Sequence, residues 1–124
     1  MIHVSTREVF EYTLERDRET DKPSIFRLKP LTPLEVKRIG DLMGNRNSEY
    51  GFPVGSFVYE NLKCGLVGWD NVEDKAGKPV KFAKEKDGRV KDAIIAMLGS
   101  DDQSELAFAI WGAAKLTEED EKNS

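Results

Sequence analysis

The chain has 124 residues, of which 34% are charged, and a formal net charge of −4. This length suits one compact domain around one hydrophobic core. No apolar run approaches the roughly 18 residues that a membrane-spanning helix needs, and the first ten residues lack the order of a signal peptide. A single cysteine, Cys64, and a single histidine, His3, exclude an intrachain disulfide and a structural zinc site. We therefore expect a cytosolic protein without a metal or cofactor.

The first elements predicted in chain order are two strands. Phe10, Tyr12 and Leu14 alternate with polar residues, and residues 25–28 repeat this period of two. The pattern is typical of strands with one buried face. The charged segment between them contains Pro23 and has the composition of a loop. We therefore predict an antiparallel β-hairpin, which needs a cover of other elements to be stable.

Two helices are predicted to follow the hairpin. Residues 32–35, Thr-Pro-Leu-Glu, form a capping box, so a helix is expected to begin there and to run to about Met43. A second helix is expected because apolar and small residues then recur every three or four positions along one face. Its face consists of Val54, Phe57, Val58, Asn61, Leu62, Gly65, Leu66 and Trp69.

The next segment is predicted to be a turn followed by a short extended piece. Residues 76–79, Ala-Gly-Lys-Pro, interrupt any helix. Val80 and Phe82 then alternate with charged residues, which favours extended backbone. A third helix is expected from Gly88 to Leu98. We find no internal repeat in the sequence.

A fourth helix is predicted from about Asp101 to Lys115, after a second capping box at 100–103. Residues 106–114 are apolar on every side of this helix, so it must be central or must meet a partner. Phe108 and Trp111 lie three residues apart on one face. We hypothesise that they line a surface for a partner or for self-association; a core position for Trp111 is the alternative.

The end of the chain, residues 117–124, reads TEEDEKNS and offers no apolar residue to bury. We predict that it is a disordered acidic tail. The expected architecture is an α+β fold with a single domain over residues 1–116. In it, the N-terminal hairpin packs against about four α-helices.

Charge is distributed unevenly along the chain. Residues 75–91 contain seven basic and two acidic side chains, whereas residues 92–124 contain two and eight. One hypothesis is a head-to-tail contact, in which the basic segment of one copy meets the acidic end of another. Nucleic-acid binding is the weaker interpretation, because the chain as a whole is acidic and only one aromatic residue lies in the basic segment. The candidates for partner contacts there are Lys78, Lys81 and Lys84.

No catalytic constellation is apparent in the sequence. Gly77-Lys78 lacks the earlier glycine of a phosphate-binding loop. Asp101 and Asp102 stand at a helix start, where carboxylates complement the helix dipole. We therefore expect a protein that is not an enzyme and that acts through its surfaces.

Three segments carry a more specific signal. FRLKPLTPLE at 26–35 leads into a helix, GLVGW at 65–69 precedes an acidic turn, and GKPVKF at 77–82 follows it. Together they resemble the tail assembly chaperones of long-tailed, siphovirus-like bacteriophages, over about residues 25–82. The resemblance implies a non-enzymatic protein of the host cytoplasm that binds the tape-measure protein, keeps it soluble and assists assembly of the tail tube protein around it. Some members of that family also have a longer form, made by ribosomal frameshifting.

Two other classes of function stay open. One is a structural component of the virion, such as a connector or a tail-completion protein. The other is a nucleic-acid-binding or host-directed phage protein. A homo-oligomer is compatible with each of these interpretations.

Overall fold

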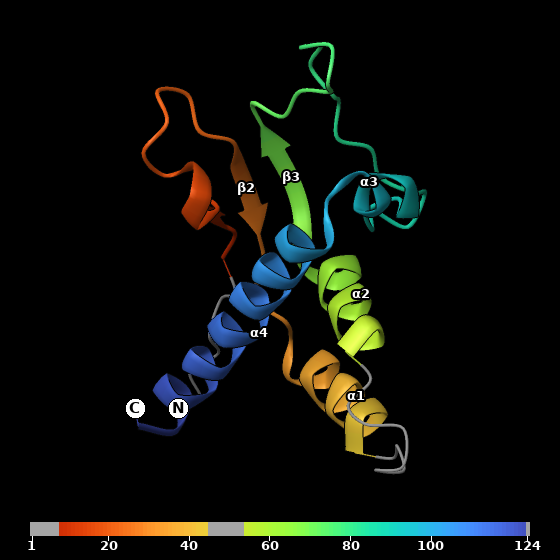
Figure 1. Ribbon diagram of the computed structural model, residues 1–124. Helices are drawn as coiled ribbons and strands as arrows, with labels where there is room; N and C mark the ends of the chain where they lie inside the picture. The colour runs from red at the N-terminus through yellow and green to blue at the C-terminus, as the bar shows by residue number, and fades with distance from the viewer. Residues whose placement is uncertain (1–7, 45–53, 124) are drawn as a thin grey trace.

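The computed structural model describes residues 8–44 and 54–123, and it shows an α+β fold (Figure 1). A three-stranded antiparallel sheet in the order β1-β2-β3 packs with the helices of this part of the chain. The strands are β1 (Phe10–Tyr12), β2 (Ile25–Leu28) and β3 (Leu66–Asp70), and a 3-10 helix, η1 (Glu15–Asp17), follows β1. The α-helices are α1 (Pro33–Gly44), α2 (Val54–Gly65), α3 (Asp92–Met97) and α4 (Ser100–Asn123).

The predicted pairing of the first two strands is confirmed. β1 runs antiparallel to β2, with Phe10 opposite Leu28 and Tyr12 opposite Phe26. Phe26 and Leu28 are buried, and Ile25 and Arg27 are half-buried, so the period of two in the sequence corresponds to one face toward the core. The two strands are not an isolated hairpin, because β3 extends the sheet on the other side of β2.

β3 occupies a segment for which the sequence predicted helix. Helix α2 ends at Gly65, and Leu66–Asp70 pairs antiparallel with β2 instead. Placing Leu66 and Trp69 on the face of the second helix was therefore wrong. Both residues are buried, as predicted, but they belong to a strand rather than to a helix. Glycines at 65 and 68 weaken a helix, and pairing with β2, about forty residues earlier, decides the outcome.

Helix α1 begins at the predicted cap. The backbone N–H of Thr32 donates to Glu35 Oε1 over 2.9 Å, and the Glu35 N–H donates to Thr32 Oγ1 over 3.2 Å. The prediction for α3 was too long, because this helix begins at Asp92 rather than at Gly88. Gly88 has a φ of +87°, a conformation that belongs to a turn and not to a right-handed helix.

Helix α4 begins at Ser100, close to the predicted start, but it continues beyond Lys115 to Asn123. The acidic segment is therefore helical where we predicted disorder. Glutamate and lysine, which make up much of this segment, both favour helix. The prediction missed this because it considered only the lack of apolar residues.

The sheet is joined to α4 by polar contacts as well as by the core. The Tyr12 hydroxyl donates to Glu105 Oε2 over 2.7 Å, and Arg16 forms an ion pair with Asp102 over 2.7 Å. Burial and the adjacent Glu105 carboxylate raise the pKa of Tyr12 to about 12. The hydroxyl is thus a protonated donor at neutral pH. Asp102, expected to complement the helix dipole, also fixes η1 against the start of α4.

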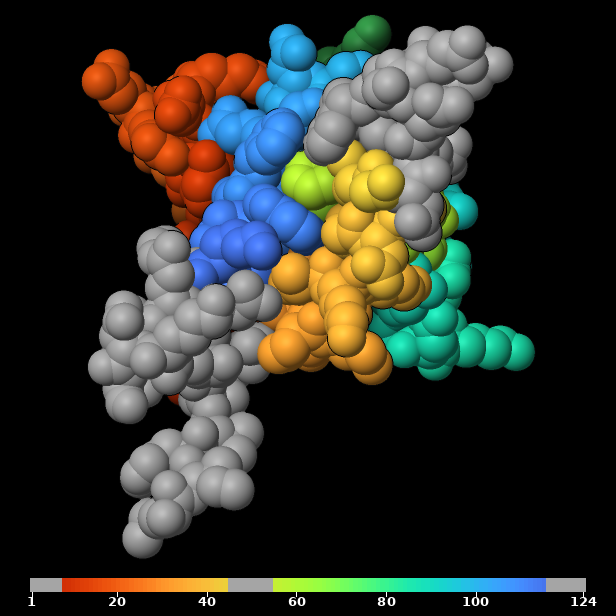
Figure 2. All heavy atoms as spheres, turned by 90° about the horizontal axis from the view of Figure 1, so that it is seen from below, coloured from red at the N-terminus to blue at the C-terminus, as the bar shows by residue number. Residues whose placement is uncertain are grey.

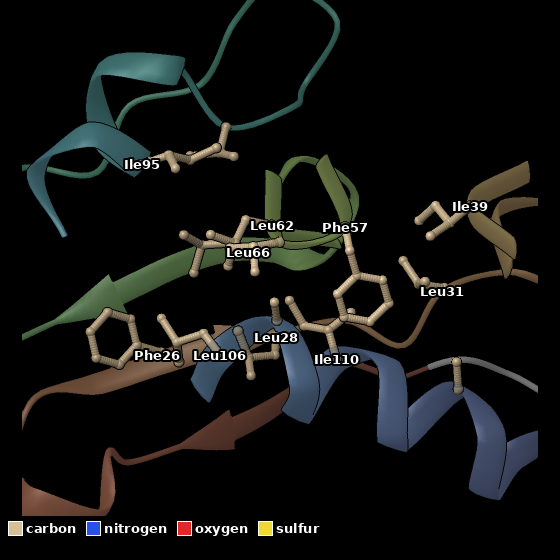
Figure 3. Close-up of a cluster of buried hydrophobic side chains, with 14 of the residues drawn as sticks. Phe26, Leu28, Leu31, Ile39, Phe57, Leu62, Leu66, Ile95, Leu106 and Ile110 are labelled. Atoms are coloured by element: carbon tan, nitrogen blue, oxygen red, sulfur yellow. The ribbon is translucent and has the colours of Figure 1, made fainter. Parts of the chain in front are cut away.

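The core lies between the sheet, α2 and α4. Figure 3 shows side chains from β2, α2, β3 and α4 pointing toward one another there. In α4 the buried positions recur at three or four residues, so this helix is central to the fold and its opposite side reaches the surface. The most deeply buried large side chains are Phe26, Leu28, Leu31, Ile39, Leu62, Leu66, Leu106 and Ile110.

Candidate partner-binding surfaces

An aromatic surface forms where α4 crosses α2. Phe108 is 54% exposed, and its ring centroid lies 5.3 Å from that of Phe57, which is buried. Trp111 is half-buried and packs edge-on against the same Phe57 ring at 5.2 Å. Figure 2 shows one face of the molecule on which part of α2 is visible between α4 and α1. We call Phe57, Phe108 and Trp111 the aromatic surface.

The two predicted residues of this surface have different positions. Phe108 points outward, as the hypothesis of a partner surface requires. Trp111 is intermediate between a core position and a partner-contacting position. Its ring covers Phe57, and the Lys115 ammonium lies 5.1 Å from the centroid of that ring. Phe108 is therefore the better residue for testing contacts with a partner. Phe57, which supports both rings from below, was not singled out by the sequence.

The basic segment folds into two successive turns with the same backbone pattern. In the first turn unit, residues 72–80, Val80 N–H donates to Val72 O and Asp74 N–H donates to Lys78 O. In the second turn unit, residues 83–91, the corresponding bonds appear eleven residues later. Each unit contains one glycine with positive φ, Gly77 or Gly88. The chain therefore has a structural repeat that the sequence analysis did not find.

The candidate lysines are exposed on and between these turn units. Lys78 is exposed, and its backbone N–H donates to Asp74 Oδ1 over 3.0 Å. Lys81 lies between the two units and Lys84 lies in the second one, and both are exposed as well. None of the three forms an ion pair with a described residue. All three are thus available to an acidic partner.

The first turn unit and the C-terminal end of α4 lie apart in the structure. In Figure 1 the first turn unit lies at one end of the molecule and the C-terminal end of α4 at the other. The head-to-tail contact between copies stays a prediction.

A buried lysine connects the second turn unit to α2, and the sequence gave no signal for it. Lys63 is only 5% exposed, and its Nζ donates to Glu85 Oε1 at 3.0 Å, Val90 O at 2.5 Å and Asp92 Oδ1 at 2.8 Å. Tyr59 donates to the same Asp92 oxygen. Burial lowers the pKa of Lys63, but hydrogen bonds to Asp92 and Glu85 outweigh this and leave that pKa raised. The ammonium is therefore charged and structural.

The ion cluster predicts how stability depends on pH. Hydrogen bonds from Lys63 and Tyr59 lower the pKa of Asp92 below its usual 3.8. Its stabilising contribution is therefore present above about pH 4 and is lost as the pH falls through the lower pKa of the folded state. The raised pKa of Lys63 makes its own contribution complete below about pH 10.5 and lost above that.

When the pH falls from 5 to about 3, the free energy of unfolding is expected to decrease less in a Lys63→Met variant than in the unmodified chain. Urea unfolding gives the free energy of unfolding of both proteins at each pH in this range. The slopes of this free energy against pH are then compared. Equal slopes would show that Asp92 gains nothing from Lys63.

Cys64 does not offer a reactive thiolate. It is half-buried, and Arg38 Nη2 lies 3.3 Å from its sulfur. Burial and the nearby Glu35 carboxylate raise the pKa of the thiol to about 11. The thiol form therefore dominates at neutral pH, which agrees with a packing role.

The described residues contain neither a metal-ligand cluster nor a membrane-spanning helix. No cluster of three or more histidine, cysteine, aspartate or glutamate side chains with the arrangement of metal ligands is found there. None of the helices in that part of the chain is both long and apolar enough to cross a bilayer. Comparisons of the chain with models of protein families, with curated proteins and with solved structures give no match.

Proposed function

We propose that this protein is a tail assembly chaperone of a long-tailed bacteriophage, which binds the tape-measure protein and assists assembly of the tail tube. The observation that carries the proposal is the aromatic surface. It places an exposed phenylalanine on the outer side of a central helix, with a buried ring below it. A tape-measure chain has apolar helical faces that need cover before the tube encloses them, and an aromatic surface of this kind suits that task.

The arrangement of the three resembling segments supports the same proposal. They correspond to β2 with the start of α1, to β3, and to the end of the first turn unit. The segments converge on Trp69, whose ring packs edge-on against Phe26 at 6.1 Å and against Phe82 at 5.4 Å. One aromatic residue from each of the three segments thus packs into a single cluster.

The experiment is co-expression with the tape-measure protein encoded by the same phage. The chain is expected to keep the tape-measure protein in the soluble fraction and to co-purify with it. Phe108→Glu should weaken the complex at least tenfold, because an aromatic anchor at the centre of an interface is commonly worth about 2 kcal/mol or more. Since Phe108 is already exposed, this variant should fold normally, which circular dichroism verifies.

Leu34→Glu is the matched control. Leu34 is 77% exposed on α1 and does not belong to the aromatic surface, so this variant should bind as the unmodified chain does. The proposal is wrong if the tape-measure protein is equally insoluble with and without the chain. If the protein is instead a stoichiometric part of purified virions, the structural alternative replaces the chaperone.

A further inference from the structure

The outward side of α4 carries a protruding ring and a gap one helical turn apart. Phe108 is 54% exposed, whereas Gly112, four positions later on the same side of the helix, has no side chain. Glu105 and Lys115 lie on this side as well, one before Phe108 and one after Gly112. We call Glu105, Phe108, Gly112 and Lys115 the outer stripe of α4.

The fold of this chain does not require a glycine at position 112. Gly112 lies in the interior of α4, and it is not one of the described glycines with positive φ. A Cβ atom built on it would meet nothing within 4 Å, and alanine is more favourable than glycine in a helix interior. The gap beside Phe108 therefore weakens the helix without relieving a contact inside the molecule. A contact from outside the molecule accounts for it.

The ring and the gap fit a second copy of the same helix. When two identical helices pack about a two-fold axis, every contact is reciprocal, so that residue i of one copy meets residue j of the other and j meets i. With the axis midway between Phe108 and Gly112, each Phe108 ring lies over Gly112 of the other copy. The missing side chain allows this close approach, because the distance between two helix axes depends on the side chains at their contact.

The charges of the outer stripe favour the antiparallel orientation that this axis requires. Parallel packing would place Lys115 beside Lys115 of the other copy and Glu105 beside Glu105. Antiparallel packing in the register given above instead places Lys115 opposite Glu105 of the other copy. The Glu105 carboxylate is held in place, because its Oε2 accepts the Tyr12 hydroxyl and the Glu15 N–H. The stripe is thus complementary to itself in shape and in this pair of charges.

We propose that this chain forms a two-fold dimer through the outer stripe of α4, with Phe108 of each copy seated over Gly112 of the other. One pair of helices buries less than the about 1,200–2,000 Å² of a stable interface, so the dimer is weak and reversible. It needs no other protein and does not rest on the chaperone proposal. One consequence does rest on that proposal: the dimer must open before a tape-measure helix contacts Phe108.

Sedimentation equilibrium of the full chain alone, over a series of concentrations, tests the dimer. The unmodified chain is expected to show a monomer–dimer equilibrium. Gly112→Ala should weaken the dimer about fivefold or more, because its methyl group occupies the gap in a packed contact. The monomer should be at least as stable as before, since the added Cβ atom meets nothing. Damage to the fold cannot weaken association while leaving stability intact.

Gly40→Ala is the matched control. Gly40 lies in α1, outside both the aromatic surface and the outer stripe, and a Cβ atom there also meets nothing within 4 Å. The variant makes the same change in a helix that has no aromatic residue one turn away. Its dimer should dissociate at the same concentration as that of the unmodified chain.

A mixed disulfide tests the register of the two helices. In a Cys64→Ser background, one protein carries Phe108→Cys and the other carries Gly112→Cys. Their mixed dimer brings the two new thiols together and keeps one intact contact of Phe108 with Gly112, whereas neither variant alone keeps such a contact. Because a disulfide needs Cα atoms within about 7 Å of each other, oxidation of the mixture should give the mixed disulfide faster than either variant gives its own.

Three results would overturn the proposal. The first is a chain that stays monomeric at every concentration. The second is a Gly40→Ala variant whose association is weakened as much as that of Gly112→Ala, since the effect would then not be local to the stripe. The third is a disulfide of Phe108→Cys with itself that forms as fast as the mixed one, which would show a different register or a parallel contact.

Discussion

A Gly65→Ala variant is expected to lose about 3 kcal/mol of unfolding free energy and to melt about 10 °C below the unmodified chain. Gly65 is the buried residue at which α2 ends and β3 begins. A Cβ atom there would lie 2.6 Å from Ile110 Cγ2 and 2.9 Å from the backbone oxygen of Lys29. Both distances are far inside van der Waals contact, so some part of the structure must move.

Neither neighbour can move easily. Ile110 is fully buried in the core, where a change of rotamer would collide with other side chains. The backbone of Lys29 is fixed as well, because its N–H donates to Gly65 O over 2.8 Å. The strain therefore falls on the contact between α4 and the junction of α2 with the sheet, which is the centre of the fold.

Gly40→Ala provides the matched control within α1. A Cβ atom at Gly40 meets nothing within 4 Å, and alanine favours a helix interior by up to about 1 kcal/mol over glycine. This variant should therefore be as stable as the unmodified chain or slightly more stable. Thermal and urea unfolding, followed by circular dichroism, measure the stability of both variants. A Gly65→Ala protein that melts with the unmodified chain would contradict the close packing of Ile110 on Gly65.

The parts of the fold that could be predicted from sequence are those with a local signal. The alternation around Tyr12 identified β1, and the capping box at 32–35 identified the start of α1. β3 could not be identified in this way, because Leu62, Gly65, Leu66 and Trp69 fit a helical period and the competing partner, β2, is distant in the chain. Non-local pairing thus overrode a regular local pattern.

The candidate sites also divide into those with a local signal in the sequence and those without one. Phe108 was identified from the apolar character of its helix, and the lysines from the local excess of charge. The cluster at Lys63 combines residues from separate segments, so no spacing in the sequence indicates it. The repeated turn units escaped notice because they share glycine and basic positions eleven residues apart but few other identities.

Replacing Trp69 is expected to have the largest effect on stability. Trp69→Ala removes a buried ring that packs against both Phe26 and Phe82, and truncating a buried aromatic residue to alanine commonly costs about 3–5 kcal/mol. Since small domains have about 5–15 kcal/mol of stability, a large part of the folded population should be lost near body temperature. Urea unfolding measures the loss, and Trp111→Phe, at a half-buried position, should cost far less.

Trp69→Phe separates the ring from its hydrogen bond. The smaller ring fills most of the site, but the bond from the indole N–H to Val80 O is lost, at a cost of about 1 kcal/mol beyond the loss of volume. Because Val80 N–H in turn donates to Val72 O, amide exchange of Val80 should become faster relative to that of Leu62 in α2. Unchanged exchange at Val80 would mean that the first turn unit holds its shape without Trp69. A faster rate would instead show that one indole couples the sheet to the backbone of the first turn unit.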